Sequence, residues 1–554
     1  MAAEALGAEA PTLFLRKATG LVRGWSVRDS MIYACLATNF VTLAIYEFAF
    51  AAPAFPKGQL ITSVVISGVW VSFLVVAYAG LIVTIPRAGG DYVWQTRILG
   101  SGLGFVMAAT GWWFILWLWA PIYGNILAVQ FFEPIWATLK WSWPGSGTTR
   151  GAAWFGTHTG IFVVSLITIA LAGVLVSVGM AGYAKIQRYC FFGGLVGFAV
   201  IVVLLLVNNH ATFVSSFNLE AHNLFGVKNA YATTQATAGK IAGYTPTKLA
   251  FGPLGPTMLL VPVMMFFILW PNWGATLYGE IRGASDFRRV LTGMFGGLWI
   301  TVALTVGFLL LIYKTMGWAF YQNSNQLAFN VEGILRTPGS GTAIWPYPVM
   351  FAGWLVHNTA FQVILILVMS LWFFGWVGTL FLSSTRVIFA AAFDRVLPDR
   401  AAEVSEKRKV PVYSLVLMLL PAAALSAVYA YDSTFVKYTY DATLVIAVTF
   451  LFSAIAVVLL PFLKKDLWRA SPASKIRIFG VQIVPVAGWV TIGLLGFNLY
   501  EWLTNNNYYV NLHPSLIFMA CLYLLAVIVY VVARIVRRRQ GIDLGLINKE
   551  IPVE

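Results

Sequence analysis

The residues best suited to bind a ligand interrupt an apolar stretch at 256–290. Within it, the run Trp270-Pro271-Asn272-Trp273-Gly274 follows a series of apolar residues. Proline removes a backbone donor and clashes with the preceding helical turn, and glycine lowers the penalty for leaving helical geometry. In hydrocarbon, the freed N–H and C=O groups are tolerated only where protein or a wet cavity satisfies them. The pattern predicts a helix break at membrane depth, where main-chain groups can hold a ligand, or else a packing kink.

A second polar interruption lies in an apolar segment near the N-terminus, in the run ACLATNFVTLAIYEF. Asn39 and Thr42 sit on adjacent turns, where they offer an amide and a hydroxyl to a solute or satisfy a broken backbone. Glu47 lies two turns further along. An ionisable group inside a membrane span indicates function by default. We therefore expect Glu47 to attract a cationic solute or carry a proton, and the alternative is a carboxyl hydrogen-bonded to a neighbouring helix.

Two further sets of residues are candidates. Phe266, one turn before the break, is expected to close the site as an aromatic gate, or simply to pack. Thr379 and Ser383 are four residues apart and share one helix face. With carbonyls from the first helix they could coordinate sodium, a hard cation that prefers oxygen ligands. Ser and Thr also serve as contacts between membrane helices. Glu280 and Arg282 are expected to act in structure or gating rather than binding.

The composition places these residues in a membrane protein. The 554 residues are 59% hydrophobic and only 10% charged, whereas soluble domains carry about 25% charged residues. A span needs about 20 apolar residues, and this rule predicts an all-α polytopic protein with about twelve transmembrane helices. Of the 36 Lys and Arg residues, 27 fall in the tails and even-numbered loops. This bias places both termini in the cytoplasm and assigns the net charge of +15 to topology rather than to nucleic acid.

The predicted helices divide the chain into six parts. The two interrupted helices each open a set of five, the best sequence indicator of an inverted-repeat transporter. An odd number of helices per set makes the second set enter from the opposite side. The predicted parts are a cytoplasmic tail 1–28, a first repeat 29–207, an outer loop 208–256, a second repeat 257–463, two appended helices 464–536 and a cytoplasmic tail 537–554.

Three local runs resemble the amino acid–polyamine–organocation superfamily of permeases. They are IPRAGGDYVWQTRILGSGLGF, GEIRGASDFRR and SSTRVIFAAAFDRVLPDR, followed by VPVYSLVL. Their order and spacing match over most of residues 25–464. The resemblance implies a five-plus-five inverted repeat in the LeuT-like arrangement, and secondary transport by alternating access.

The chain departs from that family in two places. Many members have Gly-x-Gly in the first helix to hold a substrate carboxylate, and here that place is Thr42-Leu43-Ala44. Some proton-linked members carry a lysine midway along the fifth helix, where this chain has Gly194. Neither a carboxylate cradle nor a lysine-based proton linkage is therefore supported by the sequence.

We expect a plasma-membrane permease for a small organic solute bound between the first and sixth helices, and the family resemblance implies that this solute is an amino acid. A polyamine or organic cation is the alternative, and a channel or a transporter-like receptor is weaker. No histidine, aspartate or cysteine pattern indicates an enzyme or a metal centre. We expect no cofactor, a proton or sodium as coupling ion, the lipid bilayer as a partner, and a monomer or homodimer.

Overall fold

The computed structural model describes residues 24–141, 150–246, 248–330, 333–335, 343–432 and 439–551. Most of the predicted tail 1–28 and the last three residues lie outside these ranges. Twelve helical segments in the described residues are long and apolar enough to cross a bilayer, which confirms the predicted all-α polytopic membrane fold. Numbered spans 1 to 12, they are Val27–Ala51, Leu60–Thr84, Ser101–Leu139, His158–Ser177, Met180–Val207, Leu254–Glu280, Phe287–Thr315, Thr359–Phe393, Val412–Tyr431, Thr439–Leu463, Ile483–Thr504 and His513–Arg539.

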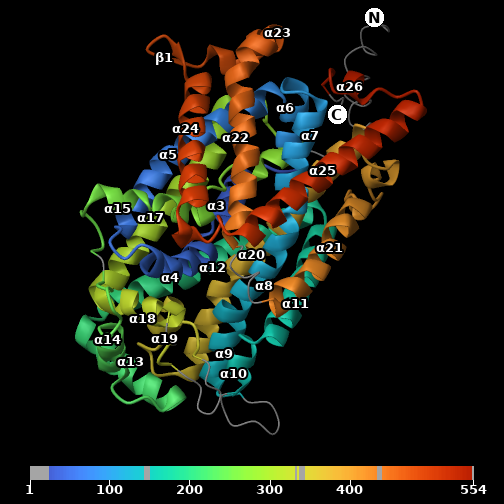
Figure 1. The fold of residues 1–554 in the computed structure, drawn as a ribbon. Coiled ribbons are helices and arrows are strands. Elements are labelled where there is room, and N and C mark those ends of the chain that lie inside the picture. Colours follow the sequence, from blue (N-terminus) through green and yellow to red (C-terminus); the bar gives the residue numbers. More distant parts are fainter. Residues whose placement is uncertain are drawn as a thin grey trace, which may run out of the picture.

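The bundle has two distinct ends (Figure 1). The upper end in the figure carries α6 (Asp91–Ile98), α23 (Lys465–Ala470), the β1–β2 hairpin (Arg477–Ile478 with Val481–Gln482) and α26 (Leu544–Ile547). We call it the basic end, because most Lys and Arg residues fall in its connections. The lower end carries α9 (Glu133–Leu139), α10 (Arg150–Trp154), α13 (His210–Phe225) and α14 (Ala230–Ala238). We call it the cap end.

Span 1 is not one continuous α-helix. A capping box formed by Ser26 and Asp29 starts α3 (Val27–Thr38), which satisfies backbone donors that a helix start leaves unpaired. The helix stops because Asn39 adopts a left-handed conformation, with φ 37° and ψ 81°. Asn tolerates this region better than most residues. A π-helical turn, Phe40–Ala44, leads into α4 (Ile45–Ala54).

Span 6 consists of three pieces. The short α15 (Leu254–Met258) leads into α16 (Val261–Ile268), which ends before Pro271. The chain then turns and resumes as a 3₁₀-helix over Trp273–Glu280, eight residues long. Runs of 3₁₀-helix longer than about four residues are uncommon, and within a longer helix they often mark a hinge. Proline explains the stop, because it has no N–H and clashes with the preceding turn.

The remaining spans are mostly regular. Span 3 bends through two π-turns (Thr110–Phe114 and Ala128–Phe132) that flank α8 (Leu116–Leu127), after α7 (Ser101–Ala109). The other long helices are α5 (Leu60–Thr84), α11 (His158–Ser177), α12 (Met180–Val207), α17 (Phe287–Thr315), α20 (Thr359–Phe393), α21 (Val412–Tyr431), α22 (Thr439–Leu463), α24 (Ile483–Thr504) and α25 (His513–Arg539).

In two regions the structure adds detail to the sequence expectation. The stretch predicted as an outer loop, 208–256, contains α13 and α14, which pack with α18 (Trp318–Asn330) at the cap end. The long apolar region near 350–393 contains a short helix, α19 (Pro348–Gly353), and then the single 35-residue α20. Apolar composition did not indicate α13 and α14, because both helices are rich in Asn, Thr and Ala.

Candidate functional site

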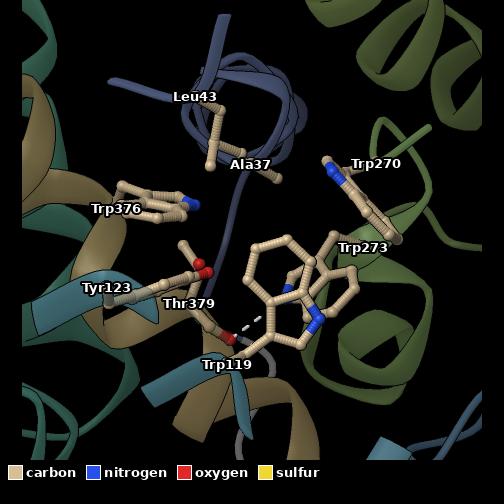
Figure 2. A pocket seen from close by; sticks show the side chains of 8 residues that line it. All are labelled: Ala37, Leu43, Trp119, Tyr123, Trp270, Trp273, Trp376 and Thr379. Carbon is tan, nitrogen blue, oxygen red and sulfur yellow. Dashed lines mark hydrogen bonds between the residues drawn. The ribbon is translucent and has the colours of Figure 1, made fainter. Parts of the chain in front are cut away.

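A small closed cavity lies between spans 1, 3, 6 and 8 (Figure 2). Its free volume is about 10 Å³, which is about the space that one water molecule needs. The residues around it are at most 4% exposed. The residues lining it are Ala37, Leu43, Trp119, Tyr123, Trp270, Trp273, Trp376 and Thr379.

Aromatic rings from three spans form most of the cavity wall. Tyr123 of α8 lies against Trp376 of α20, with ring centroids 3.5 Å apart. Trp119 meets Trp270 edge-on at 5.7 Å, and Trp270 meets Trp273 at 5.3 Å. Aromatic pairs at these separations are each worth about 0.5–1.5 kcal/mol beyond area burial. The cavity is therefore bounded by a connected set of rings that must move together to enlarge it.

The span 1 break contributes polar groups beside the cavity. The Asn39 side-chain oxygen accepts a hydrogen bond from the Thr42 N–H at 2.9 Å, which caps the π-turn. Gln130 donates its amide N–H to the Thr42 carbonyl at 2.9 Å. The Asn39 amide nitrogen and the Trp119 indole nitrogen are buried and form no hydrogen bond with any described residue. A ligand or a water molecule could accept a hydrogen bond from such unpaired donors.

The span 6 break presents a different surface. Phe266 stacks on Trp119 with centroids 5.1 Å apart, so it supports the cavity wall from behind. Asn272 is fully buried and lies beside Tyr78 of α5, without a well-formed hydrogen bond. Gly274 lies against the Tyr33 ring, which a methyl group would meet at 3.4 Å. Asn272 and Gly274 thus face the surrounding helices rather than the cavity.

Of the two proposed sodium ligands, the Ser383 hydroxyl is hydrogen-bonded, whereas the Thr379 hydroxyl is buried without a well-formed hydrogen bond. The Tyr33 hydroxyl donates to the Thr379 carbonyl at 3.0 Å and shares a 2.6 Å hydrogen bond with the Ser383 hydroxyl. Ser383 donates to the Trp273 carbonyl at 3.1 Å, and the Trp273 indole donates to the Thr379 carbonyl at 3.2 Å. The Tyr33 hydroxyl thus links the Thr379 carbonyl and the Ser383 hydroxyl of span 8, and sodium binding by this pair stays a prediction.

Glu47 lies toward the cap end, away from the cavity lining. It is 3% exposed and accepts a hydrogen bond from the Tyr440 hydroxyl of α22. The Tyr440 ring packs at 5.9 Å from Phe266 and at 5.2 Å from Phe50. Glu47 and Tyr440 therefore join spans 1 and 10 on the cap side of the aromatic wall.

Buried ion pairs join the helices at the basic end. Arg386 of α20 holds Glu280 at the end of span 6 through two hydrogen bonds of 2.7 and 3.2 Å, and both side chains are essentially inaccessible. Arg97 of α6 holds Asp394 through bonds of 2.5 and 2.7 Å. Burial opposes the charge on Arg97, but the hydrogen bonds to Asp394 outweigh it and raise the pKa of Arg97.

A third ion pair and a set of backbone hydrogen bonds also join segments at the basic end. Arg188 of α12 holds Asp29 at the start of α3, with distances of 2.6 and 2.9 Å. The N–H groups of Gly24 and Trp25 donate to the Glu280 carbonyl, and the Arg282 N–H donates to the Trp25 carbonyl. The segment that precedes span 1 is therefore tied to the end of span 6.

The cavity brings together only some of the candidate residues. Leu43, Trp270 and Thr379 line it, whereas Asn39, Thr42, Ala44, Phe266, Pro271, Asn272, Gly274 and Ser383 lie around it or behind its wall. The other lining residues were not among the predicted site residues, namely Ala37, Trp119, Tyr123, Trp273 and Trp376. The run WWFILWLWAPIY showed that span 3 is rich in aromatic residues, but nothing in it indicated which rings face span 6. The roles of all these residues in binding stay predictions.

Twelve candidate spans and a small buried cavity between spans 1, 3, 6 and 8 are the features of a polytopic membrane protein. The family model described as amino acid permease matches residues 32–533. The chain therefore belongs to the amino acid permease family of the amino acid–polyamine–organocation superfamily, which confirms the predicted resemblance and the prediction that it is not an enzyme. No curated protein matches the chain significantly.

Proposed function

We propose that this protein is a secondary active transporter that carries amino acids across the plasma membrane by alternating access. The proposal depends on one observation: the segments of spans 1 and 6 that depart from α-helix border a single closed cavity, to which they contribute Leu43 and Trp270. Broken helices at the bilayer midplane are where transporters of this kind bind substrate and coupling ion.

The packing of the bundle supports a five-plus-five inverted repeat. Inversion exchanges spans 1 and 6, spans 2 and 7, spans 3 and 8, and spans 4 and 9. In agreement with this exchange, α3 packs on α17 while α16 packs on α5, and α11 packs on α8 while α21 packs on α20. We infer that spans 11 and 12 are appended and that both termini lie in the cytoplasm, since the basic end then faces inward.

The cavity must expand before a solute can bind. Space for one water molecule excludes any amino acid, so we assign this arrangement to an occluded state without substrate. Enlarging the cavity requires the Tyr123–Trp376 and Trp119–Trp270 contacts to separate. Because a ligand shifts a conformation only by its differential affinity, the substrate must replace those ring contacts with better ones in the expanded state. The unpaired donors of Asn39 and Trp119 are suited to a carboxylate or carbonyl.

An organic cation or polyamine is the second candidate, and the aromatic lining favours it. Four tryptophans and a tyrosine line the cavity, with no charged side chain among the lining residues. Aromatic cages of this kind bind ammonium groups through cation–π attraction, worth about 2 kcal/mol when desolvated. The lack of Gly-x-Gly at Thr42-Leu43-Ala44 agrees with this alternative.

Uptake into reconstituted vesicles tests the proposal. Purified protein is assayed with radiolabelled amino acids and with putrescine, under imposed proton or sodium gradients. We expect saturable uptake and exchange of an amino acid. Accumulation of putrescine alone would select the second candidate, flux without saturation would indicate a channel, and binding without accumulation would indicate a receptor.

A matched pair of tryptophan variants tests the site itself. Trp270→Phe changes the cavity wall, whereas Trp489→Phe changes a ring on span 11 that is 63% exposed. We expect Trp270→Phe to lower uptake at limiting substrate about tenfold, equivalent to about 1.4 kcal/mol, and Trp489→Phe to leave it unchanged. Equal uptake by both variants would exclude this cavity as the binding site.

A further inference from the structure

The connection between α5 and α6 packs directly on the broken part of span 6. The Gly89 N–H donates to the Thr276 carbonyl at 2.9 Å. Gly90 has φ 46°, and a Cβ atom there would lie 2.9 Å from the Ala275 carbonyl carbon and the Thr276 nitrogen. Only glycine permits so close an approach of two backbones. The next residue, Asp91, is therefore held in a fixed position next to the 3₁₀-helix of span 6.

The Asp91 carboxylate is fully buried and accepts hydrogen bonds from three different spans. Its Oδ1 accepts from the Tyr78 hydroxyl and from the Ser453 hydroxyl, both at 2.5 Å. Its Oδ2 accepts from the Trp112 indole N–H at 3.0 Å. Spans 2, 10 and 3 thus converge on one carboxyl group.

No cation neutralises this carboxylate within the described part of the chain. Its own helix carries Arg97 and Tyr92, both bound to Asp394. Among the helices packed on α6, α20 carries Arg386, which is paired with Glu280. From α5 the titratable group that faces Asp91 is Tyr78, and the residues facing it from α22 and span 3 are the neutral Ser453 and Trp112.

Asp91 is connected to the cavity by two short routes. Trp112, which donates to it, lies 4.5 Å from the ring of the cavity-lining Trp273. Tyr78, which also donates to it, lies beside Asn272 in the span 6 break. A change at the carboxylate therefore reaches both the wall of the cavity and the break in the helix.

We propose that Asp91 is a proton-binding residue that couples proton uptake to the geometry of the span 6 break. The inference rests on the proposed transport function. One proton binds to a carboxylate oxygen and later leaves from it, and no other bond is made or broken. Once protonated, the carboxyl group becomes a donor. An indole N–H can only donate, so a proton on Oδ2 displaces Trp112, and a proton on Oδ1 requires Tyr78 or Ser453 to accept.

The energetics of the site agree with this role. Burial raises the pKa of Asp91 to about 6, against the opposing hydrogen bonds from Ser453, Tyr78 and Trp112. The group therefore changes its protonation state within the pH range that a proton-driven transporter works in. A carboxylate that merely fixed the α5–α6 connection would not give transport a pH dependence.

The test uses full-length protein in vesicles, with an amino acid that the wild type exchanges. A gradient of one pH unit can drive about tenfold accumulation per coupled proton. We expect Asp91→Asn to retain exchange without a gradient but to lose this accumulation and the dependence of uptake on pH. Asp441→Asn is the matched control, because Asp441 is also buried and bonds to the neutral Ser515, at the cap end. It should behave like the wild type.

A second variant keeps the test informative if Asp91→Asn does not fold. Ser453→Ala removes one hydrogen bond to the carboxylate, and we expect the midpoint of the pH profile to rise by about one unit. Wild-type accumulation and an unchanged pH profile in Asp91→Asn would overturn the inference, as would an unmoved midpoint in Ser453→Ala. Wild-type exchange with no response to a pH gradient would overturn the coupling role alone. No exchange by the wild type at all would instead overturn the proposed transport function.

Discussion

The two ends of the bundle are closed by different chemistry. At the basic end, Glu280, Asp394 and Asp29 are each held by an arginine through two hydrogen bonds. At the cap end, two buried acids meet neutral donors, since Tyr440 donates to Glu47 and Ser515 donates to Asp441, while Glu220 is bonded to His357. A neutral hydrogen bond contributes about 0.5–1.5 kcal/mol, whereas breaking a buried ion pair costs about 3–5 kcal/mol.

This difference indicates which end opens more easily. The cap end can separate by exchanging single neutral hydrogen bonds for water. The basic end must hydrate or re-pair two fully buried arginine–carboxylate pairs and a third pair, Asp29 with Arg188, in which the arginine side chain is 37% exposed. We infer that, without substrate, this arrangement opens toward the cap side more readily, and that opening the basic end depends on bound solute.

The strongest test removes an arginine from the fully buried pair. Arg386→Met leaves the Glu280 carboxylate buried without its cation, and we expect a loss of about 3–5 kcal/mol in stability. Thermal unfolding of detergent-solubilised protein measures it. The double variant Arg386→Met with Glu280→Gln should recover much of the loss, because no buried charge is left unpaired. Equal instability of the single and double variants would contradict this account.

Asp91 is the exception at the basic end, because no cation among the described residues is bonded to its carboxylate. Its pKa of about 6 in the folded protein exceeds the value near 3.9 of an unfolded chain, so folding favours the protonated form. Its contribution to stability is fully present below pH 4 and is lost as the pH rises through 6, a change on the order of 3 kcal/mol. Stability measured from pH 4 to 8 should show this decline in the wild type and a flatter profile in Asp91→Asn.

A matched pair of substitutions compares the ends directly. Asp394→Asn strands Arg97, whereas Asp441→Asn alters a carboxyl bound only by Ser515. We expect Asp394→Asn to lower the free energy of unfolding by about 2 kcal/mol more than Asp441→Asn does. Denaturation of both variants under identical conditions provides the comparison. Similar losses would show that the charges at the basic end add nothing beyond ordinary hydrogen bonds.

The smallest effect is expected from Tyr440→Phe. The variant loses only the hydrogen bond to Glu47, so its stability should fall by about 1 kcal/mol. The cap end should open more often as a result. A cysteine introduced at Leu43, in a background without the three native cysteines, should then react faster with a water-soluble thiol reagent. An unchanged labelling rate would show that this contact does not control opening.

Local chemistry made part of this structure predictable. Pro271 and Gly274 identified the region where α16 ends, because their effect on helical backbone does not depend on neighbours. The twelve spans followed from apolar composition alone and are confirmed. Asn39 was identified only as a polar residue at mid-span, since Asn occupies both helical and left-handed backbone.

The partners of these residues were not predictable in the same way. Glu280 and Arg386 lie 106 residues apart, and the sequence contains many other acids and arginines that could pair. The cavity wall depends on which faces of spans 3 and 8 meet span 6. With 85 Phe, Tyr and Trp residues in the chain, aromatic content could not distinguish Trp119 or Trp376 from rings that face lipid.

The eight-residue 3₁₀-helix from Trp273 to Glu280 is longer than an α-helix of the same number of residues would be. Its rise is about 2.0 Å per residue, compared with 1.5 Å in an α-helix. Rewinding those eight residues would therefore shorten the segment by about 4 Å. One end of it carries a cavity-lining indole and the other the carboxylate gripped by Arg386. A change from 3₁₀-helix to α-helix in this one segment would thus move the cavity wall relative to the Glu280–Arg386 ion pair, without any helix having to tilt.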